Sequence, residues 1–210
     1  MYPGVVPKLW SETIESHRRE VHDAILDTAA ALAAEYGLLS VTMSQIAEKT
    51  GIGRATLYKY FPDVETIVRA WHQRQVADHL ARLVVARDRA VGDENRLVAV
   101  LETYGSIQRH RVKAHRHQPH GTELAAFVHR DPQIAQAERK VQQLIRELID
   151  EAAAAGAVRN DVDAGELADY CVGALSAASR LTSQQAVQRL VAVIMSGLRP
   201  LEGSDERMSS

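Results

Sequence analysis

The sequence has little of what stabilises small secreted proteins or spans a membrane. Its single cysteine, Cys171, excludes an internal disulfide framework and fits a reducing cytoplasm. No apolar run approaches the roughly 18 residues of a transmembrane helix, and residues 1–8 lack a signal-peptide pattern, so we expect a cytoplasmic protein without a membrane partner. Aromatic residues make up only 5% of the chain, which leaves no cluster of rings to cage a cationic ligand.

Motifs that mark enzymes are also missing. The sequence has no Gly-rich phosphate loop, no histidine pair with a glutamate and no serine elbow, so we expect neither catalysis nor a cofactor. The formal net charge of −2 is not that of a general polyanion binder. At 210 residues, with 46% hydrophobic and 25% charged residues, the chain fits one or two small soluble domains.

Residues 41–61 are the most informative stretch and predict two short helices joined at a glycine. Thr42 and Gln45 have the spacing of a capping box at the start of the first helix. Gly51 can take the left-handed conformation that ends a helix, and Pro62 stops the second helix. This layout is typical of a helix-turn-helix, whose second helix lies in the DNA major groove.

The predicted second helix carries side chains suited to DNA. Lys59 and Arg54 can neutralise phosphates, and Arg54 can instead bind guanine O6 and N7. The hydroxyl of Tyr58 can donate to a phosphate, and the free amides at the start of the first helix favour an anion. The residues that we predict at the DNA are Thr42, Ser44, Gln45, Lys49, Gly53, Arg54, Ala55, Thr56, Tyr58, Lys59 and Tyr60.

Other residues of this helix are expected to hold it against a core. Leu57, Tyr60 and Phe61 are the expected anchors, and Tyr60 keeps two open roles because its hydroxyl can also reach a phosphate. Cations gather near the proposed reading head, whereas many acids lie far downstream, so one end of the protein is expected to face DNA. These cations are Arg18, Arg19, Lys49, Arg54 and Lys59.

The N-terminal third resembles the signature of the tetracycline-repressor (TetR) family of transcriptional regulators. The resemblance spans roughly residues 18–70 and rests on Val41-Thr42-Met43, Ile46-Ala47, Gly51-Ile52, Arg54, Thr56-Leu57-Tyr58, Tyr60-Phe61 and Glu65. It implies a repressor that binds a palindromic operator in double-stranded DNA, with Tyr58 and Lys59 as phosphate anchors. One departure is Val64, because family members often carry lysine before the glutamate of the fourth helix.

Helical periodicity runs through nearly the whole chain and no strand alternation is evident, so we predict an all-α fold. Asp63 can cap a long fourth helix after Pro62. With the resemblance, the predicted domains are an N-terminal tail and helix-turn-helix domain over 1–62, a helical effector-binding and dimerisation domain over 63–200, and a disordered tail over 201–210.

The last two predicted helices, Ala164–Leu181 and Ser183–Leu198, have the widest apolar faces. These faces can be buried inside one subunit, or they can form a four-helix bundle between two subunits. The small residues of the first of these helices would let helix backbones approach closely, and the resemblance implies a homodimer through both helices. These small residues are Gly173, Ala174, Ala177 and Ala178.

The resemblance further implies that the C-terminal region binds a small-molecule effector whose identity the sequence does not give. Plausible contacts of a largely apolar pocket, each of which can equally be ordinary core, are Trp71, Tyr104, Phe127, Tyr170 and Cys171. Alternatives are a DNA-binding factor without a ligand, or a regulator that responds to redox state through Cys171.

A histidine-rich basic segment contains His110, His115, His117 and His120. Within a helix, no two of the first three histidines stand three or four residues apart, which disfavours a metal site. A short helix is expected to follow at 123–129. The segment can be a solvated basic connector, a metal-sensing site or a patch for an acidic ligand.

Overall fold

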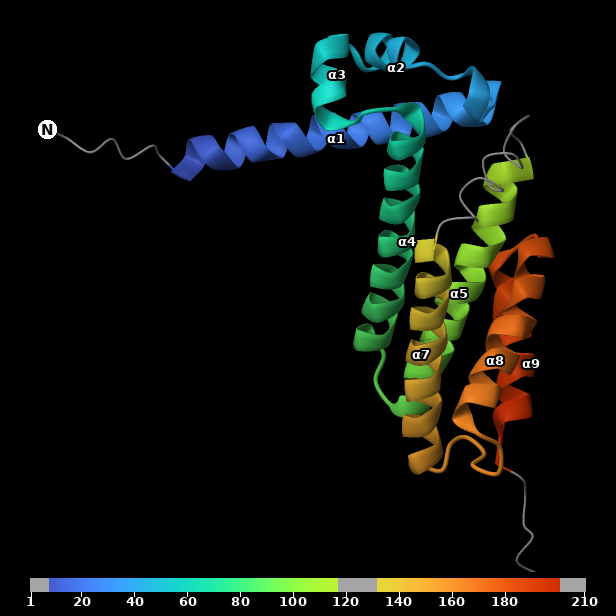
Figure 1. Cartoon of the computed structure of the whole chain (residues 1–210). Helices are drawn as coiled ribbons and strands as arrows, with labels where there is room; N and C mark the ends of the chain where they lie inside the picture. The colour runs from blue at the N-terminus through green and yellow to red at the C-terminus, as the bar shows by residue number, and fades with distance from the viewer. Residues whose placement is uncertain (1–7, 117–131, 201–210) are drawn as a thin grey trace, which may run out of the picture. The chain divides into compact units, whose positions relative to one another are not determined.

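The computed structural model describes residues 8–116 and 132–200, with side chains over 13–110 and 136–200. Within these ranges every element is a helix, which confirms the all-α prediction (Figure 1). None of the described helices is long and apolar enough to cross a membrane. The elements are α1 (Lys8–Tyr36), η1 (Leu38–Ser40), α2 (Met43–Thr50), α3 (Arg54–Tyr60), α4 (Val64–Arg89), α5 (Asp93–Arg116), α7 (Pro132–Ala154), α8 (Ala164–Ser176), η2 (Ala177–Arg180) and α9 (Gln184–Leu198).

The chain forms two compact units that divide inside α4, between Arg74 and Gln75. The division therefore falls further along the chain than the boundary predicted at residue 62. The physical reason is that α4 is unbroken: Ile67 and Val68 in its first turns belong to the core of unit 1, whereas Leu83 belongs to the core of unit 2.

Unit 1 is built on α1, which packs against η1 and α2, while α2 packs against α3 (Figure 1). Helix α1 begins at Lys8, earlier than the resemblance from about residue 18 indicates, and ends at Gly37, whose φ is 85°. Arg74 of α4 forms ion pairs with Asp23 (2.9 Å) and Asp27 of α1. These pairs connect α4 to α1 outside the apolar core.

Unit 2 contains α5, α7, α8 and α9, with α8 packed against both α7 and α9 (Figure 1). Gly105 of α5 is buried where this helix meets the last two helices. A Cβ atom at Gly105 would lie 2.7 Å from a methyl carbon of Val187 and 3.1 Å from one of Leu175. Glycine at this position therefore allows α5 to approach α8 and α9 more closely than alanine would.

Two helix ends in unit 2 differ from the prediction. Helix α8 ends at Ser176 and continues as the 3₁₀ helix η2, whereas one helix was expected up to Leu181. The N–H of Leu181 bonds the carbonyl of Ala178 at 3.0 Å, a tightened last turn of the kind that often closes helices. Helix α5 continues to Arg116, although the apolar pattern weakens after Ile107. The helix predicted at 123–129 lies outside the described residues, as does the tail after residue 200.

Candidate nucleic-acid interface

The turn between α2 and α3 is fixed by Gly51. Its φ of 71° and ψ of 22° are left-handed, and its N–H bonds the carbonyl of Glu48 at 3.1 Å. The N–H of Ile52 returns to the carbonyl of Ala47 at 3.0 Å, and the Ile52 side chain packs against the core of unit 1. The predicted glycine turn is thereby confirmed, and it sets the direction in which α3 leaves α2.

The start of α2 carries the predicted capping box. The amide of Gln45 donates to Thr42 Oγ1 at 3.3 Å, and the amide of Thr42 donates to Gln45 Oε1 at 2.8 Å. Both side chains are exposed, whereas Ser44 is half-buried in the first turn. Since the capping bonds already engage Thr42 and Gln45, their contribution to DNA binding stays a prediction.

Helix α3 has one buried and one exposed face. Leu57 is fully buried and Phe61 is 6% exposed, as expected for the residues that hold the helix against the core. Tyr58 on the opposite face is 56% exposed. The remaining predicted contacts with exposed side chains on and before α3 are Lys49, Arg54, Ala55, Thr56 and Lys59. The helix therefore presents its polar side chains outward as a set.

The exposed cations of this surface are not neutralised within the protein. Among the described residues no ion pair involves Lys49, Arg54 or Lys59. Gly53, the N-cap of α3, has an ordinary φ of −68°, and a Cβ there would meet only Thr56 Oγ1, at 3.8 Å. The backbone at this position is open to a close partner.

Tyr60 is half-buried at the C-terminal end of α3, beside α1. The guanidinium of Arg18 lies over its ring, 5.9 Å from the centroid, and the ring of His22 lies 6.5 Å away. The His22 ring also contacts Phe61, with centroids 5.1 Å apart. Sequence reasoning placed Arg18 near the reading head through charge alone, and the structure shows the contact by which it joins α3.

Asp63 caps α4 as predicted, accepting a bond of 2.7 Å from the amide of Thr66. This backbone hydrogen bond lowers the pKa of Asp63 below its ordinary value. The carboxylate already satisfies part of the helix start that was expected to remain free for a phosphate, next to Val64.

The residues predicted to contact an effector belong to different parts of the structure. Trp71 packs against the core of unit 1, Tyr104 packs against the core of unit 2, and Phe127 lies outside the described residues. Cys171 is fully buried in the core of unit 2, and Tyr170 is 47% exposed. Their role in ligand binding stays a prediction.

Burial raises the pKa of the Cys171 thiol to about 12, which removes the thiolate that a redox switch requires. His110 is exposed, and one of its ring nitrogens lies 2.7 Å from the carbonyl of Ser106. The side chains of His115, His117 and His120 lie outside the described ones. Within the described parts of the chain, no three histidine, cysteine, aspartate or glutamate residues gather as metal ligands would.

This geometry is that of a helix-turn-helix protein, and comparisons with known proteins agree with it. Residues 25–71 match the family described as bacterial regulatory proteins, tetR family, and residues 107–200 match the C-terminal domain described as transcriptional regulator SbtR-like. The chain belongs to the TetR family. Regulators of this family bind DNA, are not enzymes and are typically dimers with small-molecule effectors.

Individual relatives are distant. The chain is 28% identical over 90 residues to the HTH-type transcriptional regulator MT2310 of Mycobacterium tuberculosis, a match that covers 43% of this chain and 48% of the relative. It therefore spans about half the length of the curated relatives it matches. A TetR/AcrR-family regulator from Thermobifida fusca superposes with a TM-score of 0.64 at 19% identity, over 86% of this chain and 99% of that one.

The fatty acid degradation regulator FadR from Bacillus halodurans superposes with a TM-score of 0.63 at 20% identity, over 85% and 96% of the two chains. At these identities the structural likeness establishes the fold.

Proposed function

We propose that the protein is a sequence-specific DNA-binding transcriptional regulator that acts as a homodimeric repressor and is released by a small molecule. The observation that carries the proposal is the division of α3 into a buried anchor, Leu57, and an exposed polar face containing Arg54 and Lys59 without ion-pair partners among the described residues. A short helix with this division can enter the major groove while its inner face holds it to the domain.

Selection from a random pool of duplexes tests sequence-specific binding. Because a dimer of helix-turn-helix units reads two half-sites about 34–36 Å apart, the selected sequences should contain an inverted repeat with centres about one helical turn, or a multiple of it, apart. A pool that shows no enrichment after several rounds contradicts sequence-specific recognition.

The proposed dimer surface is the outer face of α8 and α9. Tyr170 of α8 crosses to α9, where a Cβ at Gly197 would lie 3.3 Å from the tyrosine hydroxyl. Val193, one helical turn before Gly197, is 65% exposed, and a Cβ at Gly173 would meet nothing within 4 Å. An exposed valine beside an open glycine favours close packing against a second copy of these helices.

A buried charge should break this dimer. Val193→Asp would desolvate a carboxylate in the interface, so it should give monomers at micromolar concentration by light scattering while the wild type is dimeric. The matched control is Val91→Asp, because Val91 is 85% exposed in the loop before α5. A wild-type monomer, or a dimeric Val193→Asp variant, contradicts this assignment of the interface.

Release by an effector requires that the ligand bind the two states of the regulator differently. Helix α4 supports such coupling because it begins three residues after α3 ends and continues into the core of unit 2. A ligand that shifts α4 would change the spacing of the two reading heads and weaken operator binding. Such a role also places the protein in the cytoplasm, with the chromosome.

The alternative is a DNA-binding factor that needs no ligand. A sensor gains thermal stability with its metabolite, by about 2.7 kcal/mol at a hundredfold excess over the dissociation constant, whereas a ligand-free factor gains none. A thermal-shift screen over metabolite classes separates these functions, and a hit must also lower DNA affinity to support the sensor.

A further inference from the structure

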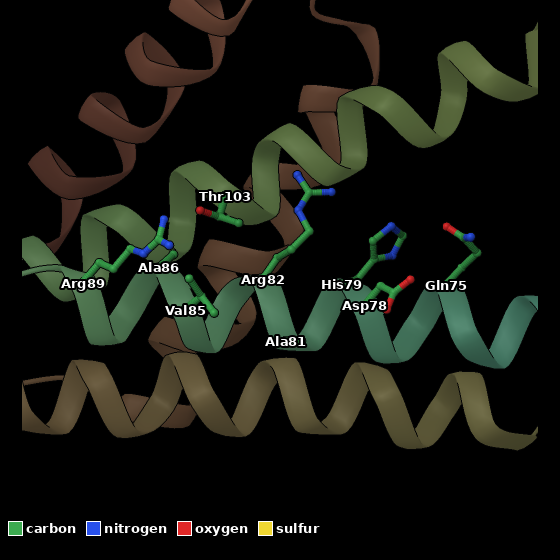
Figure 2. A pocket seen from close by; sticks show the side chains of 9 residues that line it. All are labelled: Gln75, Asp78, His79, Ala81, Arg82, Val85, Ala86, Arg89 and Thr103. Carbon is green, nitrogen blue, oxygen red and sulfur yellow. The ribbon is translucent and has the colours of Figure 1, made fainter. Parts of the chain in front are cut away.

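A groove of about 740 Å³ in unit 2 is lined by α4 and α5 (Figure 2). Its volume falls within the roughly 300–1,000 Å³ range of small-molecule sites. None of its lining residues belongs to the set predicted from the sequence to bind an effector. The lining residues are Gln75, Asp78, His79, Ala81, Arg82, Val85, Ala86, Arg89 and Thr103.

Two arginines give the groove a cationic character. Arg82 and Arg89 of α4 form no ion pair or hydrogen bond with any residue that the structure describes, whereas Arg87, outside the lining, pairs with Asp88 at 2.8 Å. Asp78 is the only acidic residue among those lining the groove. The two guanidinium groups are therefore available to an anion from outside the chain.

The two arginines are placed to act on one group. They stand seven residues apart on α4, about 10 Å along the axis, and therefore lie on one face of the helix. Figure 2 shows both side chains leaving α4 on the side of α5, with Thr103 of α5 between them. Because arginine side chains are long and flexible, both guanidiniums can close on an anionic group beside the Thr103 hydroxyl.

The wall between the arginines is apolar. Val85 follows Arg82 by three residues and precedes Arg89 by four, so it lies between them on the same face, and it is 45% exposed. The small side chains of Ala81 and Ala86 leave room beside it. A cationic rim around exposed apolar surface matches a ligand that has both a charged and an apolar part.

We infer that this groove binds an amphipathic anion whose head group, a carboxylate or a phosphate, is held by Arg82, Arg89 and Thr103 while its alkyl part covers Val85. The inference rests on the proposed function, because it gives the effector a chemical class. It replaces the uncharged apolar ligand by one that carries a negative charge.

A series of ligands with the same ten-carbon chain tests the charge. Decanoate and decyl phosphate, below their micellar concentrations, should bind the full-length protein in calorimetry without DNA and raise its melting temperature. Decanol and decyltrimethylammonium should bind at least about tenfold more weakly, because they lack the anionic acceptor for the arginines. Equal binding of decanol and decanoate, or binding of neither anion, overturns the inference.

Variants locate the site. Arg82→Gln and Arg89→Gln should each weaken decanoate binding by about tenfold, because a charge-assisted hydrogen bond is lost. Arg139→Gln, at an exposed position of α7 outside the groove, should not. Melting curves without ligand show that all three variants fold. Unchanged affinity in both groove variants contradicts the assignment.

DNA affinity is measured separately, by anisotropy with and without decanoate. If decanoate binds the groove but leaves DNA affinity unchanged, release by this ligand fails while the groove assignment stands. If the protein binds no specific DNA while decanoate binding depends on Arg82 and Arg89, the proposed regulatory function fails on its own.

Discussion

Replacing Lys59 with alanine should reduce the salt dependence of DNA binding by an amount that counts phosphate contacts. Lys59 is exposed on α3 and has no ion pair among the described residues, so its removal should change the free energy of unfolding by less than about 0.5 kcal/mol. Each phosphate contact contributes about 0.9 to the slope of log affinity against log salt. Two subunits bound to two half-sites should therefore lose about 1.8.

Fluorescence anisotropy at four or more salt concentrations measures this slope. Affinity should fall on every duplex, because a phosphate contact carries no sequence information. Lys140→Ala is the matched control, because Lys140 is an exposed lysine of α7, far along the chain from α3. An unchanged slope and affinity for Lys59→Ala would refute the phosphate contact, and an equal loss for Lys140→Ala would reduce it to net charge.

Three further substitutions or treatments test the structure. Gly51→Ala should lower the free energy of unfolding by about 1–2 kcal/mol in urea titrations, because φ is 71° there, and no loss would contradict the turn. Leu57→Ala should cost about 2–5 kcal/mol by the same assay, whereas a loss below 1 kcal/mol would show that Leu57 is not core. Iodoacetamide at pH 8 should alkylate Cys171 only in urea, since its pKa of about 12 leaves little thiolate in the native state, and fast native alkylation would contradict its burial.

Local sequence signals predicted the reading head well because the forces that build it act over short distances. The capping box of Thr42 and Gln45 and the left-handed Gly51 depend on neighbours within a few residues, and both are found in the structure. The inward placement of Leu57 also follows from helical spacing alone. The predicted DNA contacts themselves depend on a partner and stay predictions.

Features that depend on distant residues were not predictable in the same way. Gly105 is an ordinary helix residue in the sequence, and its role appears only where Val187 and Leu175 close on it. The groove likewise depends on how Thr103 of α5 faces Arg82 of α4. Aromatic residues drew the prediction toward a pocket elsewhere, because their spacing does not distinguish a pocket wall from a core.

The central claim is that α3 reads a specific DNA sequence. Fluorescence anisotropy should be measured on duplex DNA from immediately upstream of the protein's own gene and on a scrambled duplex, at several salt concentrations. The account predicts tight binding of two subunits to the upstream duplex and weaker, steeply salt-dependent binding to the scrambled one. Equal, weak binding to both duplexes, together with no enriched sequence in the random-pool selection, would contradict it.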